Sequence, residues 1–193
     1  MAQKRKVAVI VGSIRKGSFS RMVAKAMCGL APGLECEIVE IAQLSMYNQD
    51  LDENPPAEWV AFKDRIKAAD AVLFVTPEYN RSMPGVLKNA IDVASRPYGK
   101  SAWAKKPCAV VSVTPGALGA FGANHHLRQS LVFLDMPAMQ QPEAYVSNIS
   151  RSLDDKGSLS SDETREFLRK FMEAFSSWIE ANTAPAPGAA KAA

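Results

Sequence analysis

Three short apolar runs recur along the chain and predict the central strands of a sheet. Residues 7–11 and 71–75 contain only apolar residues, and residues 108–113 are interrupted only by Ser112. Continuous apolar runs rich in β-branched residues are typical of parallel strands that are covered on both faces. Residues 35–41 alternate between two sets of side chains and predict a further strand. We therefore expect a sheet of four or five strands.

The segments between these runs have apolar residues at the spacing of helices. Apolar residues at positions 59, 62, 66 and 69 recur three or four residues apart, as on one face of a helix. Pro84 is suited to the first turn of a second helix, which Pro97 follows. Ser160 and Glu163 have the form of a capping box before a long closing helix. Alternating strands and helices predict an α/β fold, a three-layer doubly wound domain with a parallel sheet between two helical layers.

Length and composition fit one domain. The chain has 193 residues, of which 47% are hydrophobic, enough for a single sizeable core. We assign residues 1–182 to this domain. Residues 183–193 mix Ala, Pro and Gly without periodicity, so we expect a flexible tail.

Charge and cysteine content exclude several classes of protein. The 23 basic and 20 acidic residues give a net charge of +3 without a run of five like charges, so no nucleic-acid partner is expected. Only five apolar residues lie between the basic Lys4-Arg5-Lys6 and Gly12, too few for a signal peptide or a membrane span. Three widely spaced cysteines argue against disulfides and against a thiolate zinc site, and they favour the cytoplasm. We expect no membrane partner and no metal site.

The loop after the first apolar run carries donors for a phosphate. Gly12 and Gly17 have the spacing of a nucleotide triphosphate loop, but Ser18 follows where that motif requires Lys. A terminal phosphate monoester suits the loop better, because hydroxyls and a guanidinium gather at the start of a helix. These donors are Ser13, Arg15, Ser18 and Ser20. The alternative is that a serine only caps the helix and that Arg15 is solvated.

Two further loops follow the other apolar runs. Thr76-Pro77-Glu78-Tyr79-Asn80 combines a restricted backbone, an aromatic ring and outward amides, which suit a planar heterocycle. An ordinary strand-to-helix turn with a surface tyrosine is the alternative. Residues 114–119 contain glycines that allow close backbone approach. Because parallel strands end at the same edge of a sheet, we expect the three loops to form one binding site.

Two of these segments resemble the NADPH-dependent FMN reductase family. Gly12-Ser13-Ile14-Arg15-Lys16-Gly17-Ser18 matches it, as does Pro77-Glu78-Tyr79-Asn80 leading into residues 82–92. The resemblance covers residues 5–180 and is closest to the bacterial chromate and quinone reductase branch. It implies a flavodoxin-like fold with strand order 2-1-3-4-5, bound FMN, and a homo-oligomer that is a dimer or a tetramer.

The resemblance also implies roles for individual residues. Around the FMN phosphate it places Ser13, Arg15, Ser18, Phe19 and Ser20, and around the isoalloxazine ring Pro77, Glu78, Tyr79 and Asn80. Thr114 and Gly116 fall at the third contact loop, and Arg81 and Ser82 at the substrate mouth. Arg81 replaces an aromatic residue common in relatives, so we expect it to attract anionic acceptors or the phosphate of the nicotinamide cofactor.

The reaction implied is ping-pong electron transfer from NADPH or NADH, through FMN, to quinones, chromate or other metal oxyanions. The cofactor carries the chemistry, so no catalytic side chain is required. Two alternatives remain open, a flavin-binding electron carrier without turnover and a phosphoryl-transfer enzyme. His125 and His126 are adjacent and unsuited to share a metal, so we expect surface or subunit-interface roles for them.

Overall fold

The computed structural model describes residues 4–183, which form a parallel five-stranded sheet in the order β2-β1-β3-β4-β5. This confirms the expected fold class and strand order. Of the expected tail, residues 184–193 lie outside the described residues. The strands are β1 (Arg5–Val11), β2 (Leu34–Ile38), β3 (Ala71–Thr76), β4 (Cys108–Val113) and β5 (Ala144–Val146). The helices are α1 (Phe19–Gly29), α2 (Ala57–Ala68), α3 (Gly85–Ser95), α4 (Phe121–Phe133) and α5 (Asp162–Asn182), with short 3-10 helices η1 (Gln49–Leu51) and η2 (Ile149–Arg151).

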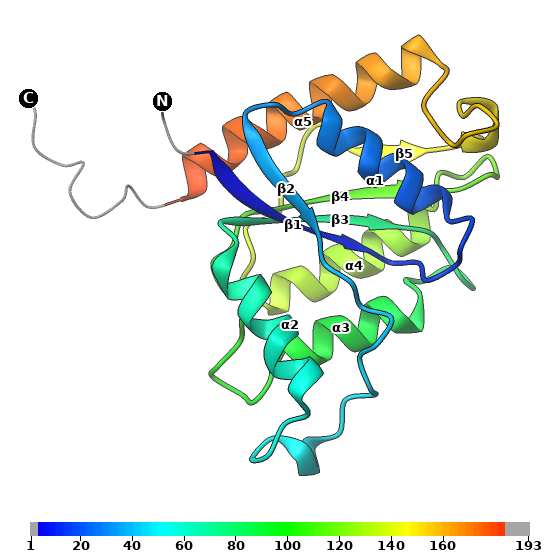
Figure 1. Ribbon diagram of the computed structural model, residues 1–193. Helices are drawn as coiled ribbons and strands as arrows, with labels where there is room; N and C mark the ends of the chain where they lie inside the picture. The colour runs from blue at the N-terminus through cyan, green and yellow to red at the C-terminus, as the bar shows by residue number, and fades with distance from the viewer. Residues whose placement is uncertain (1–3, 184–193) are drawn as a thin grey trace, which may run out of the picture.

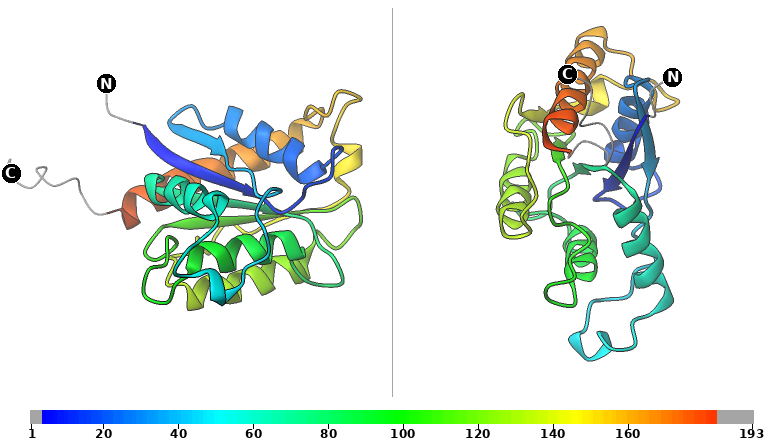
Figure 2. Two further views of the ribbon diagram at one scale, coloured as in Figure 1. Left: turned by 60° about the horizontal axis from the view of Figure 1, so that its bottom comes forward. Right: turned by 90° about the vertical axis from the view of Figure 1, so that its left-hand side faces the viewer.

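Helices cover both faces of the sheet, as Figures 1 and 2 show. Val7, Val9 and Val11 of β1 pack in the cluster that includes α1 and α5, whereas Ala8 and Ile10 pack in the cluster with α2, α3 and α4. Successive side chains of a strand point to opposite faces, so a strand buried on both sides has to be apolar throughout. This is why the continuous apolar runs became the central strands.

Trp103 anchors the face beneath α2 and α3. Its side chain is fully buried, and its indole Nε1 donates a hydrogen bond to the carbonyl of Ile91 at 2.9 Å. The rings of Phe62 and Phe74 lie 6.0 and 5.8 Å from it, centroid to centroid. The buried ring therefore ties a helix, a strand and the segment before β4 into one core, with its polar atom satisfied.

Two predicted element boundaries need correction. Strand β2 ends at Ile38 and not at residue 41. Ser161, and not Ser160, caps α5, because its side chain accepts a hydrogen bond from the amide of Thr164. The capping-box interpretation of Ser160 and Glu163 was therefore wrong by one residue, which is the usual error at helix ends.

Within residues 4–183, none of the helices combines the length and the apolar character that crossing a membrane requires.

Candidate cofactor site at the strand ends

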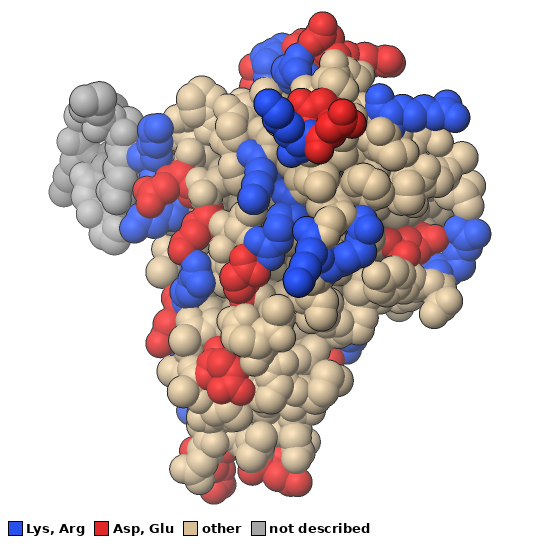
Figure 3. All heavy atoms as spheres, turned by 45° about the vertical axis from the view of Figure 1, so that its right-hand side comes forward, with Lys and Arg blue, Asp and Glu red and all other residues tan. Residues whose placement is uncertain are grey.

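A cavity of about 340 Å³ opens where β1, β3 and β4 end. Nine of the eleven residues expected to contact the cofactor line it: Ser13, Arg15, Ser18, Phe19, Ser20, Pro77, Glu78, Tyr79 and Thr114. Val113 and Pro115 complete the lining, and their position at the exit of β4 was the only sequence signal for them. Asn80 and Gly116 do not line the cavity. Figure 3 turns the side where the strands end toward the viewer and shows Lys and Arg side chains gathered over its middle.

The first loop presents buried hydroxyls at the start of α1. Ser18 and Ser20 are both only 2% exposed. The Ser18 hydroxyl accepts a hydrogen bond from the amide of Arg21 at 3.2 Å, so it caps the helix as the simpler alternative proposed. Capping and anion binding are compatible, because a helix N-terminus carries partial positive charge and unpaired amides.

Arg15 adds a full positive charge beside these hydroxyls. Its guanidinium carbon lies 5.2 Å from the centre of the Phe19 ring, which is within the range of a cation–π contact. Both side chains line the cavity. The ring therefore supports the guanidinium in the wall of the cavity, where it can make a bidentate contact to an anion.

Gly12 joins the first loop to the second. Its amide donates to the carbonyl of Val75 at 2.9 Å, and a Cβ at this position would lie 2.8 Å from Thr76 Oγ1. A side chain does not fit between these strand ends. The close approach of β1 and β3 thus depends on a residue without a Cβ.

The second loop folds back on itself in a tight turn. The backbones of Tyr79 and Ser82 exchange two hydrogen bonds of 3.0 and 2.9 Å. Asn80 and Arg81 between them both have positive φ, 49° and 63°, as a type I′ turn requires. The side chain of Tyr79, 60% exposed, stands at the open end of the cavity.

Glu78 fixes this turn to α4. One carboxylate oxygen accepts from the amide of Ala123 at 3.0 Å, in the first turn of α4, and the other accepts from Arg81 Nη1 at 2.9 Å. Gly122 allows the approach, because a Cβ there would lie 2.6 Å from the carbonyl oxygen of Arg81. The carboxylate therefore serves mainly to position the loop. No local signal in the sequence indicates the contact between Glu78 and Ala123, because these residues are 45 positions apart.

The same ion pair changes the expectation for Arg81. Its guanidinium is exposed but lies against the Glu78 carboxylate, whose side chain is 12% exposed. The pair has no net charge, so the attraction of Arg81 for anionic acceptors is weaker than an unpaired arginine would exert.

The third loop is held by hydrogen bonds from β4 and from residues after β5. Ser112 donates to the carbonyl of Gly119 at 2.6 Å, and Asn148 donates its amide to the carbonyl of Gly116 at 2.9 Å. Gly119 has φ of 61°, and a Cβ there would lie 2.6 Å from the Cβ of Tyr145. Thr114 consequently faces the cavity from a fixed loop, whereas Gly116 turns toward the segment after β5.

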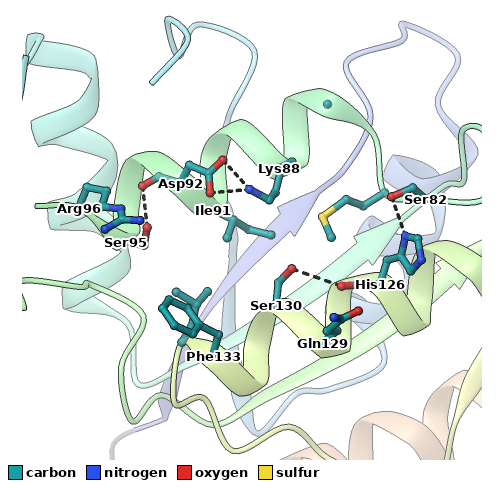
Figure 4. A pocket seen from close by; sticks show the side chains of 13 residues that line it. Ser82, Lys88, Ile91, Asp92, Ser95, Arg96, His126, Gln129, Ser130 and Phe133 are labelled. Atoms are coloured by element: carbon teal, nitrogen blue, oxygen red, sulfur yellow. Dashed lines mark hydrogen bonds and ion pairs between the residues drawn. The ribbon is translucent and has the colours of Figure 1, made fainter. Parts of the chain in front are cut away.

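A larger cavity of about 730 Å³ lies on the other side of the second loop, between α3 and α4. Figure 4 shows its walls, with Ser82 against His126 at one end and Phe133 at the other. The Ser82 hydroxyl is 3.0 Å from His126 Nδ1, and Lys88 pairs with Asp92 across one turn of α3. Ser82 thus belongs to this groove and not to the cavity at the strand ends.

The chain is similar to several known proteins. The sequence profile of the NADPH-dependent FMN reductase family matches residues 5–151. A quinone reductase of Pseudomonas putida is 59% identical over 186 residues, which cover 95% of this chain and all of that protein. A 2-hydroxy-1,4-benzoquinone reductase of a Burkholderia species is 45% identical over 175 residues, covering 90% of this chain and 96% of that protein. The solved structure of FerB, a flavoenzyme NAD(P)H:(acceptor) oxidoreductase of Paracoccus denitrificans, is 42% identical with a TM-score of 0.88, covering 93% of this chain and 100% of the other.

A substitution that adds one methyl group tests the contact between the second loop and α4. We expect Gly122→Ala to lower the free energy of unfolding by about 1–3 kcal/mol, because the new Cβ forces the Arg81 backbone away. Gly85→Ala is the matched control, since a Cβ in the first turn of α3 meets nothing within 4 Å. Urea unfolding of both variants measures the difference. Equal stability of the two variants would show that the loop does not rest on α4.

Proposed function

This chain belongs to the NADPH-dependent FMN reductase family, and from that membership we propose that it transfers electrons from NAD(P)H through FMN to quinones, chromate and similar acceptors by a ping-pong reaction. The enzyme class, the FMN cofactor and the nicotinamide reductant follow from the family. Quinones as acceptors follow from the names of its relatives. Chromate, other metal oxyanions and the ping-pong order are the further steps of the proposal. We assign residues 1–182 to one flavodoxin-like FMN-binding reductase domain.

The main support for the proposal is that hydrogen-bond donors for a phosphate line the same cavity as a loop that can contact a planar ring. Ser13, Ser18 and Ser20, with Arg15 and the N-terminus of α1, would hold the FMN phosphate. Pro77 and Tyr79 would frame the ring, with the backbone of Glu78 between them, and Thr114 would close the rim. This lining fits a ligand that has a phosphate monoester at one end and a planar ring at the other.

When bound, FMN accepts a hydride from NAD(P)H and passes electrons to the acceptor. The chain's own residues bind and orient the cofactor, and no side-chain nucleophile is assigned. The sequence has no GxGxxG loop to hold the reductant separately. We therefore infer that reductant and acceptor use one mouth in turn, which is a ping-pong order.

Broad acceptor tolerance follows from the same mouth. Its charged residues, Arg81 and Glu78, form a neutral pair, and Tyr79, which is 60% exposed, adds an aromatic ring beside them. A neutral aromatic entrance discriminates weakly between flat oxidants. We assign the protein to the cytoplasm, without a membrane or nucleic-acid partner, on the basis of its three free cysteines and nearly balanced charge.

We also propose that the chain forms a homo-oligomer, a dimer or a homotetramer, through the face of α4 and the groove beside α3. Val132 and Phe133 on α4 are 79% and 76% exposed, and large exposed apolar side chains beside a groove favour a protein partner. Leu134, Met136 and Met139, which follow α4 closely in the sequence, are buried in the core. Phe133 remains as the candidate.

The redox assignment is tested by the absorption of the purified protein. We expect flavin bands that bleach when NADPH is added without oxygen, and steady oxidation of NADPH when a benzoquinone is then supplied. Flavin bands without turnover would favour the electron-carrier alternative. A protein that binds magnesium and ATP but no flavin would point to phosphoryl transfer.

Arg15→Ala tests the phosphate end of the site. Loss of a charge-assisted contact should weaken FMN binding about tenfold, while riboflavin, which lacks the phosphate, should bind almost as before. Fluorescence titration of flavin-depleted protein measures both constants. Arg65→Ala is the control, since Arg65 pairs with Glu37 of β2 and does not line the cavity at the strand ends. An equal loss of affinity for FMN and riboflavin would show that Arg15 does not bind the phosphate.

Phe133→Glu tests the proposed interface. A charge at this apolar position should dissociate the oligomer, because burying an unpaired carboxylate is unfavourable. Val60→Glu on α2, which is 42% exposed, should leave the assembly unchanged. Sedimentation velocity distinguishes the species. A monomeric parent protein, or an oligomer unaffected by Phe133→Glu, would contradict the assignment.

A further inference from the structure

A second cavity of about 420 Å³ adjoins the proposed phosphate site, and Ser18 lines both. One wall is the exposed face of α1, which contributes Arg21, Met22 and Lys25. The other wall is the segment from Lys156 to Leu159, between β5 and α5. The cavity lies away from the ring-binding loop, since no residue of the segment 76–85 lines it.

The second wall is a fixed hairpin. Leu153 and Leu159 form an antiparallel bridge, and the Asp154 carboxylate accepts the amides of Lys156 and Ser158 at 2.9 and 2.8 Å. At Gly157, which has φ of 78°, a Cβ would lie 3.0 Å from the sulfur of Met22. The hairpin therefore rests directly on α1 and holds Lys156 across from Lys25.

The cavity is strongly basic. Its lining contains Lys16, Arg21, Lys25 and Lys156 and no acidic residue. Glu40 forms an ion pair with Arg21, whose two guanidinium nitrogens donate to its carboxylate at 2.7 and 2.5 Å, and the charge of Lys25 also acts on this carboxylate. This contact also lowers the pKa of Glu40, so the pair stays charged. Lys16, Lys25 and Lys156 form no ion pair within the described residues and can contact a ligand.

We propose that this cavity is a subsite for the phosphate-bearing adenosine half of a dinucleotide. The inference rests on the proposed function, which places the FMN phosphate at Ser18. A ligand that continues beyond this phosphate enters the second cavity, where ammonium groups face the added phosphate and Met22, Ala26 and Leu159 offer an apolar surface to the base. FAD carries such a half on its flavin phosphate, and NADPH carries the same chemistry with an additional 2′-phosphate.

The test reverses two charges that lie outside the FMN site. Lys25→Glu combined with Lys156→Glu changes both walls of the cavity. Lys67→Glu combined with Lys100→Glu makes the same change in net charge in the last turn of α2 and in the loop before β4. Flavin-depleted full-length protein is titrated with FMN and with FAD. The FMN-loaded enzyme is assayed for its KM with NADPH and with NADH.

Weaker FAD binding by about tenfold or more, with FMN binding unchanged, would support the subsite with FAD as its source. A KM for NADPH raised by a similar factor, with that for NADH unchanged, would support it with NADPH as its source. The effect should shrink at high salt, because exposed charges are screened. The control pair should show neither change.

Unchanged FAD affinity together with an unchanged KM for NADPH would overturn the subsite while leaving the proposed function intact. A parent protein that binds neither FMN nor FAD would overturn both.

Discussion

Burial of β1, β3 and β4 on both faces is the constraint on which the rest of the structure depends. Every residue from Val7 to Val11 and from Ala71 to Thr76 is buried, so these strands have no solvent-facing side on which to carry polar chemistry. Polar groups can act only where the strands end. Because the strands are parallel, their carboxyl ends meet at one edge, and the three loops that leave them share a single cavity.

The same constraint explains what the sequence could predict. A strand buried on both sides is mostly apolar, and in an open parallel sheet the loops that follow such strands are where ligands bind, so both can be recognised in the sequence. Nine of the eleven expected contact residues line the cavity for this reason. Ser112, the one polar residue in the run of β4, is also explained, since its buried hydroxyl donates to the carbonyl of Gly119 and orients the third loop.

Contacts between distant segments could not be predicted in this way. The Glu78 carboxylate accepts a hydrogen bond from the first turn of α4, and Gly122 leaves room for the Arg81 backbone. The sequence around each residue contains no pattern that predicts this contact. Asn80 is part of the expected loop, yet its positive φ places it at the tip of a turn, away from the cavity. Helix ends belong to the same class, because the choice between Ser160 and Ser161 depends on how α5 meets its neighbours. Residue preferences limit a helix end to a few positions, and tertiary packing determines which of them is used.

The distribution of charge along the strand-end edge gives the two ends of the site different tasks. At the mouth, Arg81 and Glu78 cancel each other, whereas at the α1 end Arg15 and the lysines of the adjoining cavity leave an excess of positive charge. A cofactor with a planar ring and an anionic terminus is therefore oriented by electrostatics before it makes close contacts. These charges lie apart from the mouth, where Arg81 and Glu78 form a neutral pair. The charged part and the neutral part of the site thus lie at different ends of one edge of the sheet.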